Sequence, residues 1–276
     1  MSNRLKVALL AGGNSSEREI ALASAKQIAE ALDASKYDVK VIDLHYRNMT
    51  YTAADGSQWE VDKNDFSLTV AGEKTVFEYA LIIIHGTPGE DGKLQGYLDM
   101  MGIPYSSCSQ TSSTITFDKI STKRDVAGRG INLAREVLIE ECIVGREMGC
   151  GVVITEDREF LLPITEIVSK RDFFDFEAKY TEGLSDEITP APISDEIAKK
   201  LNRMTLEAYR ACRCSGIVRI DFIVTPAGEP YMIEINSIPG MSSGSIVPKQ
   251  VREAGMTLGE LYDIVIADSL KQFGAK

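Results

Sequence analysis

The sequence has few of the residues from which zinc sites and disulfide frameworks are built. Its 276 residues include five cysteines, an odd number with no C-x-x-C spacing, and only two histidines. Zinc sites use clusters of Cys and His, and small secreted domains use an even set of cysteines. We therefore expect neither a zinc or redox protein nor a secreted, disulfide-stabilised one.

The chain also has no long apolar run and no excess of positive charge. Its longest apolar runs, such as 80–84, have the length of a strand, and the apolar start ends at Gly12, too early for a signal peptide. Lys and Arg number 30 against 41 Asp and Glu, and the net charge of −11 argues against nucleic-acid or anionic-membrane partners. We expect a soluble, cytoplasmic protein.

The N-terminal part predicts a parallel α/β unit. An apolar strand at 6–11 is followed by the capping-box pattern Ser16-x-x-Glu19, which opens a helix, and then by a second strand at 38–44. This order is a βαβ unit and implies a parallel sheet. A third strand at 79–84 is apolar enough to be buried on both faces.

The middle of the chain has weaker patterns. The polar segment 51–74 is predicted to be an irregular excursion or a small hairpin, and the Ser- and Thr-rich segment 106–116 a connection. A short helix is expected at 118–128, and an antiparallel strand pair at 147–155 and 159–168.

The C-terminal part predicts a long loop, helices and a hairpin. The segment 169–192 is long, charged and aromatic, which is typical of a functional lid. A helix at 194–212 precedes a hairpin at 216–236, and further helices are expected near 246–254 and 258–273.

The hairpin is the most informative feature, because charged side chains alternate along it. If the chain turns at the Ala-Gly pair between the strands, Asp221 lies opposite Glu234, and Arg219 lies opposite Asn236, all on one face. The opposite face of the second strand is then predicted to carry Tyr231, Ile233 and Ile235.

Two carboxylates directly opposite each other repel, so a positive group is expected between Asp221 and Glu234. Carboxylates together with an amide oxygen suit Mg²⁺, which is usually held by one or two carboxylates and substrate phosphates. From the alternation alone, a solvated strand face with incidental charges is equally open.

Two glycine-rich loops follow predicted strands. AGGNSSERE opens a helix, where backbone N–H groups attract anions, but the dinucleotide fingerprint G-x-G-x-x-G is absent, and Glu17 alone indicates a first-turn capping acid. HGTPGEDGKLQG lies at the carboxyl end of a strand, where ligands bind in open α/β sheets. His85 in this loop could bind a carboxylate, although a lone histidine is more often structural.

Several strings carry a family resemblance. They are LLAGGNSSEREI, HGTPGEDGKLQGYLDMMGIPY, FDKISTK, VLIEECIVGRE, FFDFEAKY, and RIDFIV…YMIEINSIPGMSSGSIVPKQVREAGM. In this order, over nearly the whole chain, they resemble the D-alanine–D-alanine ligases, a branch of the ATP-grasp superfamily.

The resemblance implies a mixed α/β and α+β architecture, the ATP-grasp fold. It implies an N-terminal parallel α/β substrate domain at 1–116, a remnant of the central subdomain at 117–137, and a C-terminal ATP-grasp domain at 138–276. The C-terminal domain would contain the lid loop 169–192 and the metal hairpin 216–236.

The implied reaction uses ATP to phosphorylate the carboxylate of one D-alanine. The amine of a second D-alanine then attacks the acyl phosphate, and phosphate leaves, which yields the dipeptide for peptidoglycan precursors. The implied cofactors are ATP and Mg²⁺, with Mn²⁺ as an alternative, and the implied assembly is a homodimer.

The resemblance assigns the metal and the oxyanion to the C-terminal part. Asp221, Glu234 and Asn236 match the Mg²⁺ ligands, in agreement with the hairpin argument. Arg219 and the backbone N–H of Gly240 would stabilise developing oxyanion charge.

The nucleotide would be bound by residues from three segments. Lys179 and Lys119 match contacts to ATP, and Glu140, the Ile143 backbone and Glu147 match contacts to adenine and ribose. From the residues alone, Glu140 could belong to a solvated pair and Lys119 to an exposed helix face.

The amino-acid substrates would meet a different set. Glu17 would bind the ammonium group of the first D-alanine, and His85 would lie near its carboxylate. Ser245 and the Ile246 backbone would bind the carboxylate of the second D-alanine. Tyr180 matches the position at which dipeptide ligases carry Tyr and D-lactate-using relatives often carry Phe.

One departure from the family concerns its central α/β unit, which would lie between Glu136 and Val137 and is missing here. That unit normally supplies a phosphate-binding lysine and a serine-rich glycine loop. The natural protein carries residues that this sequence omits, the unit was cut out, or the chain is a degenerate relative. We favour the first, because the other site residues are intact. An intact mass well above 30.3 kDa would support it, and a mass equal to that of these residues would refute it.

Two rival functions stay open. Another ATP-grasp ligase could make a D-alanyl-D-lactate or mixed dipeptide, and a substrate panel distinguishes it. A catalytically dead binding protein would bind ATP without D-alanine-dependent turnover.

Overall fold

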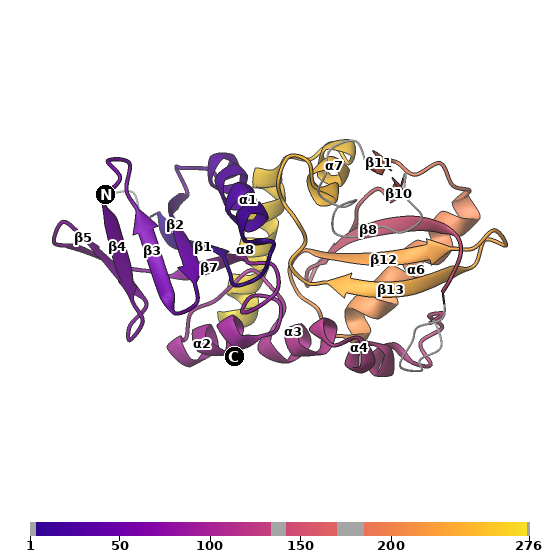
Figure 1. The fold of residues 1–276 in the computed structure, drawn as a ribbon, viewed down its shortest axis with the longest axis horizontal. Helices are drawn as coiled ribbons and strands as arrows, with labels where there is room; N and C mark the ends of the chain where they lie inside the picture. Colours follow the sequence, from indigo (N-terminus) through magenta and orange to yellow (C-terminus); the bar gives the residue numbers. More distant parts are fainter. Residues whose placement is uncertain (1–3, 134–141, 170–184, 275–276) are drawn as a thin grey trace.

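Two β-sheets, one in each half of the chain, form the frame of the molecule (Figure 1). The computed structural model describes residues 4–133, 142–169 and 185–274. The first sheet has the strand order β6-β5-β4-β3-β2-β1-β7, and the second has the order β11-β10-β8-β12-β13, with β9 paired to β8.

The strands of the first sheet are β1 (Leu5–Gly12), β2 (Tyr37–His45), β3 (Asn48–Thr52), β4 (Gln58–Asp62), β5 (Ser67–Val70), β6 (Glu73–Val76) and β7 (Tyr79–Ile83). Those of the second are β8 (Arg146–Ile154), β9 (Glu159–Leu161), β10 (Thr165–Ser169), β11 (Ser185–Ile188), β12 (Val218–Val224) and β13 (Pro230–Asn236). The described helices are α1 (Arg18–Ala31), α2 (Lys93–Met101), α3 (Gln110–Phe117), α4 (Lys119–Val126), α6 (Asp195–Ala211), α7 (Ile246–Glu253) and α8 (Leu258–Gly274).

The predicted parallel unit is confirmed, because β1 pairs in parallel with both β2 and β7. Every residue of β7 is buried, as its apolar sequence predicts. The C-terminal helix α8 returns to this sheet, where Tyr262 and Val265 share a core with Val7 and Leu9 of β1. Figure 1 shows α8 and α1 between the two sheets.

Two predictions for the middle of the chain were wrong. For the segment 51–74 the irregular alternative is wrong and the hairpin alternative is too small, because β3 to β6 form an antiparallel meander that extends the first sheet. Its tight turns use Gly56 and Gly72 at positive φ, which glycine adopts without strain. The segment 106–116 contains helix α3, whose first turn is capped by the Ser109 hydroxyl, which accepts from the Ser112 N–H.

Two element boundaries also differ from expectation. The Ser16 capping box does not form. Helix α1 begins at Arg18, and the hydroxyl of Ser15 accepts from the Glu17 N–H at 3.2 Å and donates to the His85 carbonyl at 2.8 Å. The predicted strand 159–168 is split into β9 and β10 around Pro163, which has no N–H to donate.

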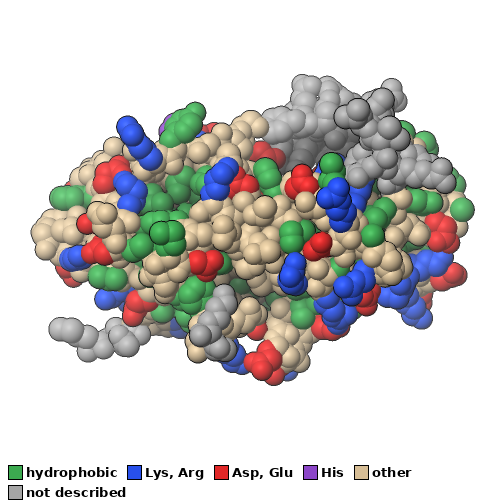
Figure 2. All heavy atoms as spheres, turned by 90° about the horizontal axis from the view of Figure 1, so that it is seen from below, with side chains coloured by type: hydrophobic (Ala, Val, Ile, Leu, Met, Phe, Trp, Pro, Cys, Tyr) green, Lys and Arg blue, Asp and Glu red, His purple; other side chains and the backbone are tan. Residues whose placement is uncertain are grey.

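Helices pack against both faces of the second sheet, α6 on one and α7 on part of the other. Helix α6 buries Leu201, Met204 and Ala208 in one core with Ile220 and Phe222 of β12. The face opposite α6 carries the polar residues of the hairpin, and α7 meets it at β8, where Gln250 Nε2 donates to the Gly149 carbonyl at 2.8 Å. Acidic and basic side chains are interspersed over the surface shown in Figure 2. Among the described helices, none combines the length and the hydrophobicity needed to cross a bilayer.

Candidate active site

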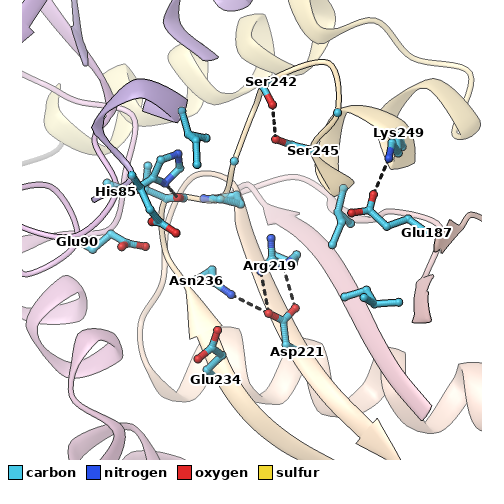
Figure 3. Close-up of a pocket in the computed structure, with 18 of the residues that line it drawn as sticks. His85, Glu90, Glu187, Arg219, Asp221, Glu234, Asn236, Ser242, Ser245 and Lys249 are labelled. Atoms are coloured by element: carbon cyan, nitrogen blue, oxygen red, sulfur yellow. Dashed lines mark hydrogen bonds and ion pairs between the residues drawn. The ribbon is translucent and has the colours of Figure 1, made fainter. Parts of the chain in front are cut away.

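A cavity of about 920 Å³ is lined by residues from both halves of the chain. The first half contributes α1 and the loop after β7. The second half contributes the face of its sheet that α6 does not cover, the loop after β13 and α7 (Figure 3). Ten residues that the sequence singles out line it: Glu17, His85, Glu147, Arg219, Asp221, Glu234, Asn236, Gly240, Ser245 and Ile246.

The hairpin has the register that the sequence predicts at the site itself. Asp221 pairs with Glu234, and Arg219 pairs with Asn236. The positive group next to Asp221 is the guanidinium of Arg219, which donates from Nε and Nη2 to the two carboxylate oxygens, each at 2.8 Å. Asn236 Nδ2 donates to Asp221 Oδ2 at 2.9 Å. Arg219 and Asp221 are both buried, so this is a fork-shaped, charge-assisted pair with little competing water.

The prediction that Ile233 and Ile235 share the face away from the site was wrong. The register shifts after Asp221, so that Phe222 pairs with Met232 and Ile233 becomes an extra residue. Such a bulge reverses the alternation on one strand. Ile235 is buried in the core with α6, whereas Ile233 lines the cavity beside Glu234.

The donor set of the hairpin fits a hard cation. Asp221 and Glu234 offer carboxylate oxygens, and Asn236 offers an amide oxygen once its amide is turned around. Within the described ranges, no three Asp, Glu, Cys or His side chains form a ready metal cluster. The amide and a phosphate would have to complete the ligand shell, as is usual for Mg²⁺.

Residues of the first half reach the cavity from the ends of strands. Glu17 is the N-cap residue of α1, but its side chain makes no capping bond, and it lines the cavity. The alternative of a purely capping acid therefore loses its support. His85 follows β7 and is buried, with Nδ1 2.9 Å from the carbonyl oxygen of Ile238 in the second half. This contact links the two walls of the cavity.

The loop after β13 depends on a close backbone approach. A Cβ on Gly240 would lie 2.8 Å from Ser245 Oγ, so only glycine fits without a shift. The Ser245 hydroxyl lies 2.8 Å from that of Ser242 and does not cap α7, although Ser245 is the N-cap residue. The first-turn N–H groups of α7 thus lie beside the cavity without this side-chain cap, and they favour an anion there.

Two of the sequence-predicted residues that the structure describes do not line the cavity, and three others cannot be placed. Lys119 Nζ lies 4.0 Å from Glu234 Oε2 on a half-exposed side chain, close to the hairpin but outside the lining. Ile143 precedes β8 and does not line the cavity. Glu140, Lys179 and Tyr180 fall outside the described residues.

Sequence reasoning missed several lining residues. Glu90 accepts from the Gly86 N–H at 2.6 Å and shapes the loop after β7. Its place within HGTPGEDG was a usable signal. Lys249 and Glu187 form an ion pair across one wall, with 2.6 Å between Nζ and Oε2. Nothing local in the sequence pairs them, because 61 residues separate them and the pairing is tertiary.

Comparisons with known proteins agree with this arrangement. A family model described as D-ala D-ala ligase N-terminus matches residues 6–108, and one described as D-ala D-ala ligase C-terminus matches residues 109–267. The D-alanine–D-alanine ligase of Azobacteroides pseudotrichonymphae is 36% identical, with 94% of this chain and 98% of the relative covered. That of Bacteroides fragilis is 34% identical, with the same coverage.

Solved structures give the same result. The D-alanine–D-alanine ligase of Bacillus anthracis, complexed with ATP, superposes with a TM-score of 0.77 at 26% identity and 99% coverage of both chains. The VanG D-Ala:D-Ser ligase of Enterococcus faecalis has a TM-score of 0.84 at 24% identity, over 96% of this chain and 99% of that one, and supports the fold alone.

The alignments bear on the missing central unit. The alignment to the Azobacteroides protein extends over 318 positions, more than the 276 residues of this chain. It must therefore include positions at which the relative has a residue and this chain has none.

Proposed function

This chain belongs to the D-alanine–D-alanine ligase family, and we propose that it joins two D-alanines at the expense of ATP, by way of D-alanyl phosphate. The observation that carries this proposal is the convergence of ten predicted residues from both halves on one cavity. The product would enter peptidoglycan precursor synthesis. The proposal includes a cytoplasmic location, a homodimer, and the domain limits 1–116, 117–137 and 138–276.

The second half would carry the phosphoryl chemistry. Asp221, Glu234 and Asn236 would hold Mg²⁺, which neutralises phosphate charge when bound. Arg219 and the Gly240 N–H would stabilise the oxyanion that develops as the acyl phosphate forms and is attacked. Arg219 is already fixed by its fork on Asp221, so little reorganisation is needed in the reaction.

The first half would hold the first D-alanine. The Glu17 carboxylate would bind its ammonium, and His85, fixed through Nδ1 to the Ile238 carbonyl, would lie near its carboxylate. Ser245 and the Ile246 N–H would bind the carboxylate of the second D-alanine. These contacts hold both amino acids in reach of each other, which replaces a bimolecular encounter by a positioned one.

The nucleotide would lie across Lys119 and Glu147, with the Ile143 backbone, Glu140 and Lys179 as further contacts. Tyr180 would favour D-alanine over D-lactate as the second substrate.

The experiment is ADP release from Mg-ATP by the purified protein, with and without D-alanine, after its intact mass has been determined. Release that depends on D-alanine supports the ligase. Release only with D-lactate as acceptor would favour a depsipeptide ligase, and ATP binding without release would favour a binding protein.

A further inference from the structure

An ion pair in the wall of the cavity has no role in the chemistry described so far. Lys249 of α7 donates from Nζ to Glu187 Oε2 of β11 at 2.6 Å, and both residues line the cavity (Figure 3). The Lys249 side chain is 34% exposed and that of Glu187 14%. The ammonium can therefore be reached from the cavity, while its partner is largely covered.

The charge balance of the cavity makes this ammonium unusual. Seven carboxylates line the described part of the cavity, on Glu17, Glu19, Glu90, Glu147, Glu187, Asp221 and Glu234. Its cationic lining residues are Arg219 and Lys249. The guanidinium of Arg219 already forms two bonds to Asp221. Among the described lining residues, Lys249 is thus the cationic side chain that is not engaged with the hairpin, and it lies in a lining whose other charged side chains are mostly carboxylates.

The position of Lys249 on its helix puts it next to a second anion-attracting feature. Ser245 is the N-cap residue of α7, and Lys249 follows four residues later. Residues four apart on a helix are neighbours on one face. Side chains on a helix tilt toward its N-terminus, where the first N–H groups have no partner within the helix, so an ammonium on this turn and those N–H groups can serve one carboxylate.

We propose that Lys249 binds the carboxylate of the second amino acid and sets the enzyme's requirement for a free carboxylate on that substrate. Glu187 is its positioning residue, which holds the ammonium in the cavity until the substrate carboxylate replaces it. This inference rests on the proposed ligase function. The proposed Lys249 contact adds a side-chain cation to the Ser245 and Ile246 contacts, and it gives β11, which carries Glu187, a role in positioning that cation.

A purely structural ion pair would behave differently. If the pair only fastened β11 to α7, then Lys249→Met and Glu187→Gln would each break it and would change the enzyme alike. If Lys249 binds the substrate, the two variants should differ. Lys249 contacts the substrate carboxylate, whereas Glu187 competes with that carboxylate for the ammonium.

The test measures KM for the acceptor D-alanine at saturating ATP in the wild type, Lys249→Met and Glu187→Gln. Loss of a charge-assisted bond predicts a rise of about tenfold or more for Lys249→Met, with kcat changed less than about threefold. Glu187→Gln leaves this KM unchanged or lowers it. With D-alaninamide as acceptor, counted by mass spectrometry as D-alanyl-D-alaninamide, wild type and Lys249→Met have equal KM, because the carboxylate is gone.

Lys200→Met is the matched control, since Lys200 pairs with Glu229 at 2.8 Å, is similarly exposed, and does not line the cavity. Thermal melting of all variants identifies loss of folding, and Lys249→Gln replaces Lys249→Met if that variant is unfolded. Equal KM rises in Lys249→Met and Glu187→Gln, an unchanged KM in Lys249→Met, or an effect that persists with D-alaninamide would overturn the inference. A wild type without D-alanine-dependent turnover would instead refute the proposed function itself.

Discussion

The two halves of the molecule deliver side chains to the cavity by different means. In the first half, β7 and residues 7–12 of β1 are buried, and Glu17 and His85 reach the cavity from segments that follow these strands. In the antiparallel half, Arg219 and Asp221 project from the face of β12 that α6 does not cover. A strand buried on both faces can offer only its ends, whereas a sheet face that is only partly covered can offer side chains along its strands.

This difference predicts that substitutions in the two halves affect stability and activity differently. Side chains on a sheet face are held by strand register and by one another, so a change there disturbs stability and activity together. Side chains at strand ends are held by caps and loop bonds, so a change there should affect substrate binding with little effect on folding.

The largest effect is expected for Arg219→Met. It removes an oxyanion donor, which typically costs about 10²–10³-fold in kcat. It also leaves the buried Asp221 carboxylate without its ion pair, which costs about 3–5 kcal/mol of unfolding free energy. Steady-state ADP release and denaturant unfolding measure the two effects. Arg219→Lys, which keeps the charge but not the fork, should lie between wild type and Arg219→Met, and full activity in either variant would remove Arg219 from the reaction.

Glu17→Gln should separate binding from stability. Loss of the charged contact to the ammonium of the first D-alanine predicts a rise in its KM of about 10- to 100-fold. The melting temperature should stay within about 2 °C, because the Glu17 side chain makes no capping bond to α1. Glu19→Gln, on an exposed neighbour that also lines the cavity, is the control. Equal KM changes in the two variants would contradict a specific role for Glu17.

Gly240→Ala should have a smaller effect, through geometry alone. The added Cβ meets Ser245 Oγ at 2.8 Å and forces that hydroxyl to move, which predicts about a tenfold loss of kcat/KM for the second D-alanine. Gly244→Ala in the same loop has nothing within 4 Å of the new Cβ and should stay within about twofold of wild type. If both variants behave alike, the close approach at Gly240 has no functional importance.

The smallest effect on activity is expected from modification of the cysteine thiols, because none of the cysteines is among the proposed site residues. Burial raises the pKa of the Cys150 and Cys212 thiols to about 12, so both stay protonated at pH 8 and should resist iodoacetamide in the folded protein. Cys142 is exposed and should react first, without loss of activity. Peptide mapping after labelling measures this, and rapid labelling of Cys150 would indicate that the second sheet opens.

The sequence predicted those parts of the fold in which a local pattern decides the structure. The β1–α1–β2 unit follows from periodicity, and the pairing of Asp221 with Glu234 follows from alternation and the position of the turn. Helix α3 was missed because Ser and Thr side chains cap and back-bond within the segment, as the Thr116 hydroxyl does to the Ser112 carbonyl.

The parts that could not be predicted depend on longer-range packing. The bulge at Ile233 cannot be recognised from the alternation of the sequence. It places the Ile233 side chain in the cavity lining and not on the face away from the site. The Lys249–Glu187 pair forms only when β11 and α7 meet. Most cavity residues of the candidate site were identified through family strings, whereas the hairpin alone predicted the metal-binding face.

If the two halves of this chain form a single ligase site, ADP release and dipeptide formation should be coupled, and the stoichiometry of the reaction measures this. D-alanyl-D-alanine and ADP should be counted together by mass spectrometry, on protein whose intact mass has been compared with 30.3 kDa. We expect one dipeptide for each ADP, and neither product above background when D-alanine is omitted. ADP release that does not depend on D-alanine, or that yields no dipeptide, would contradict it.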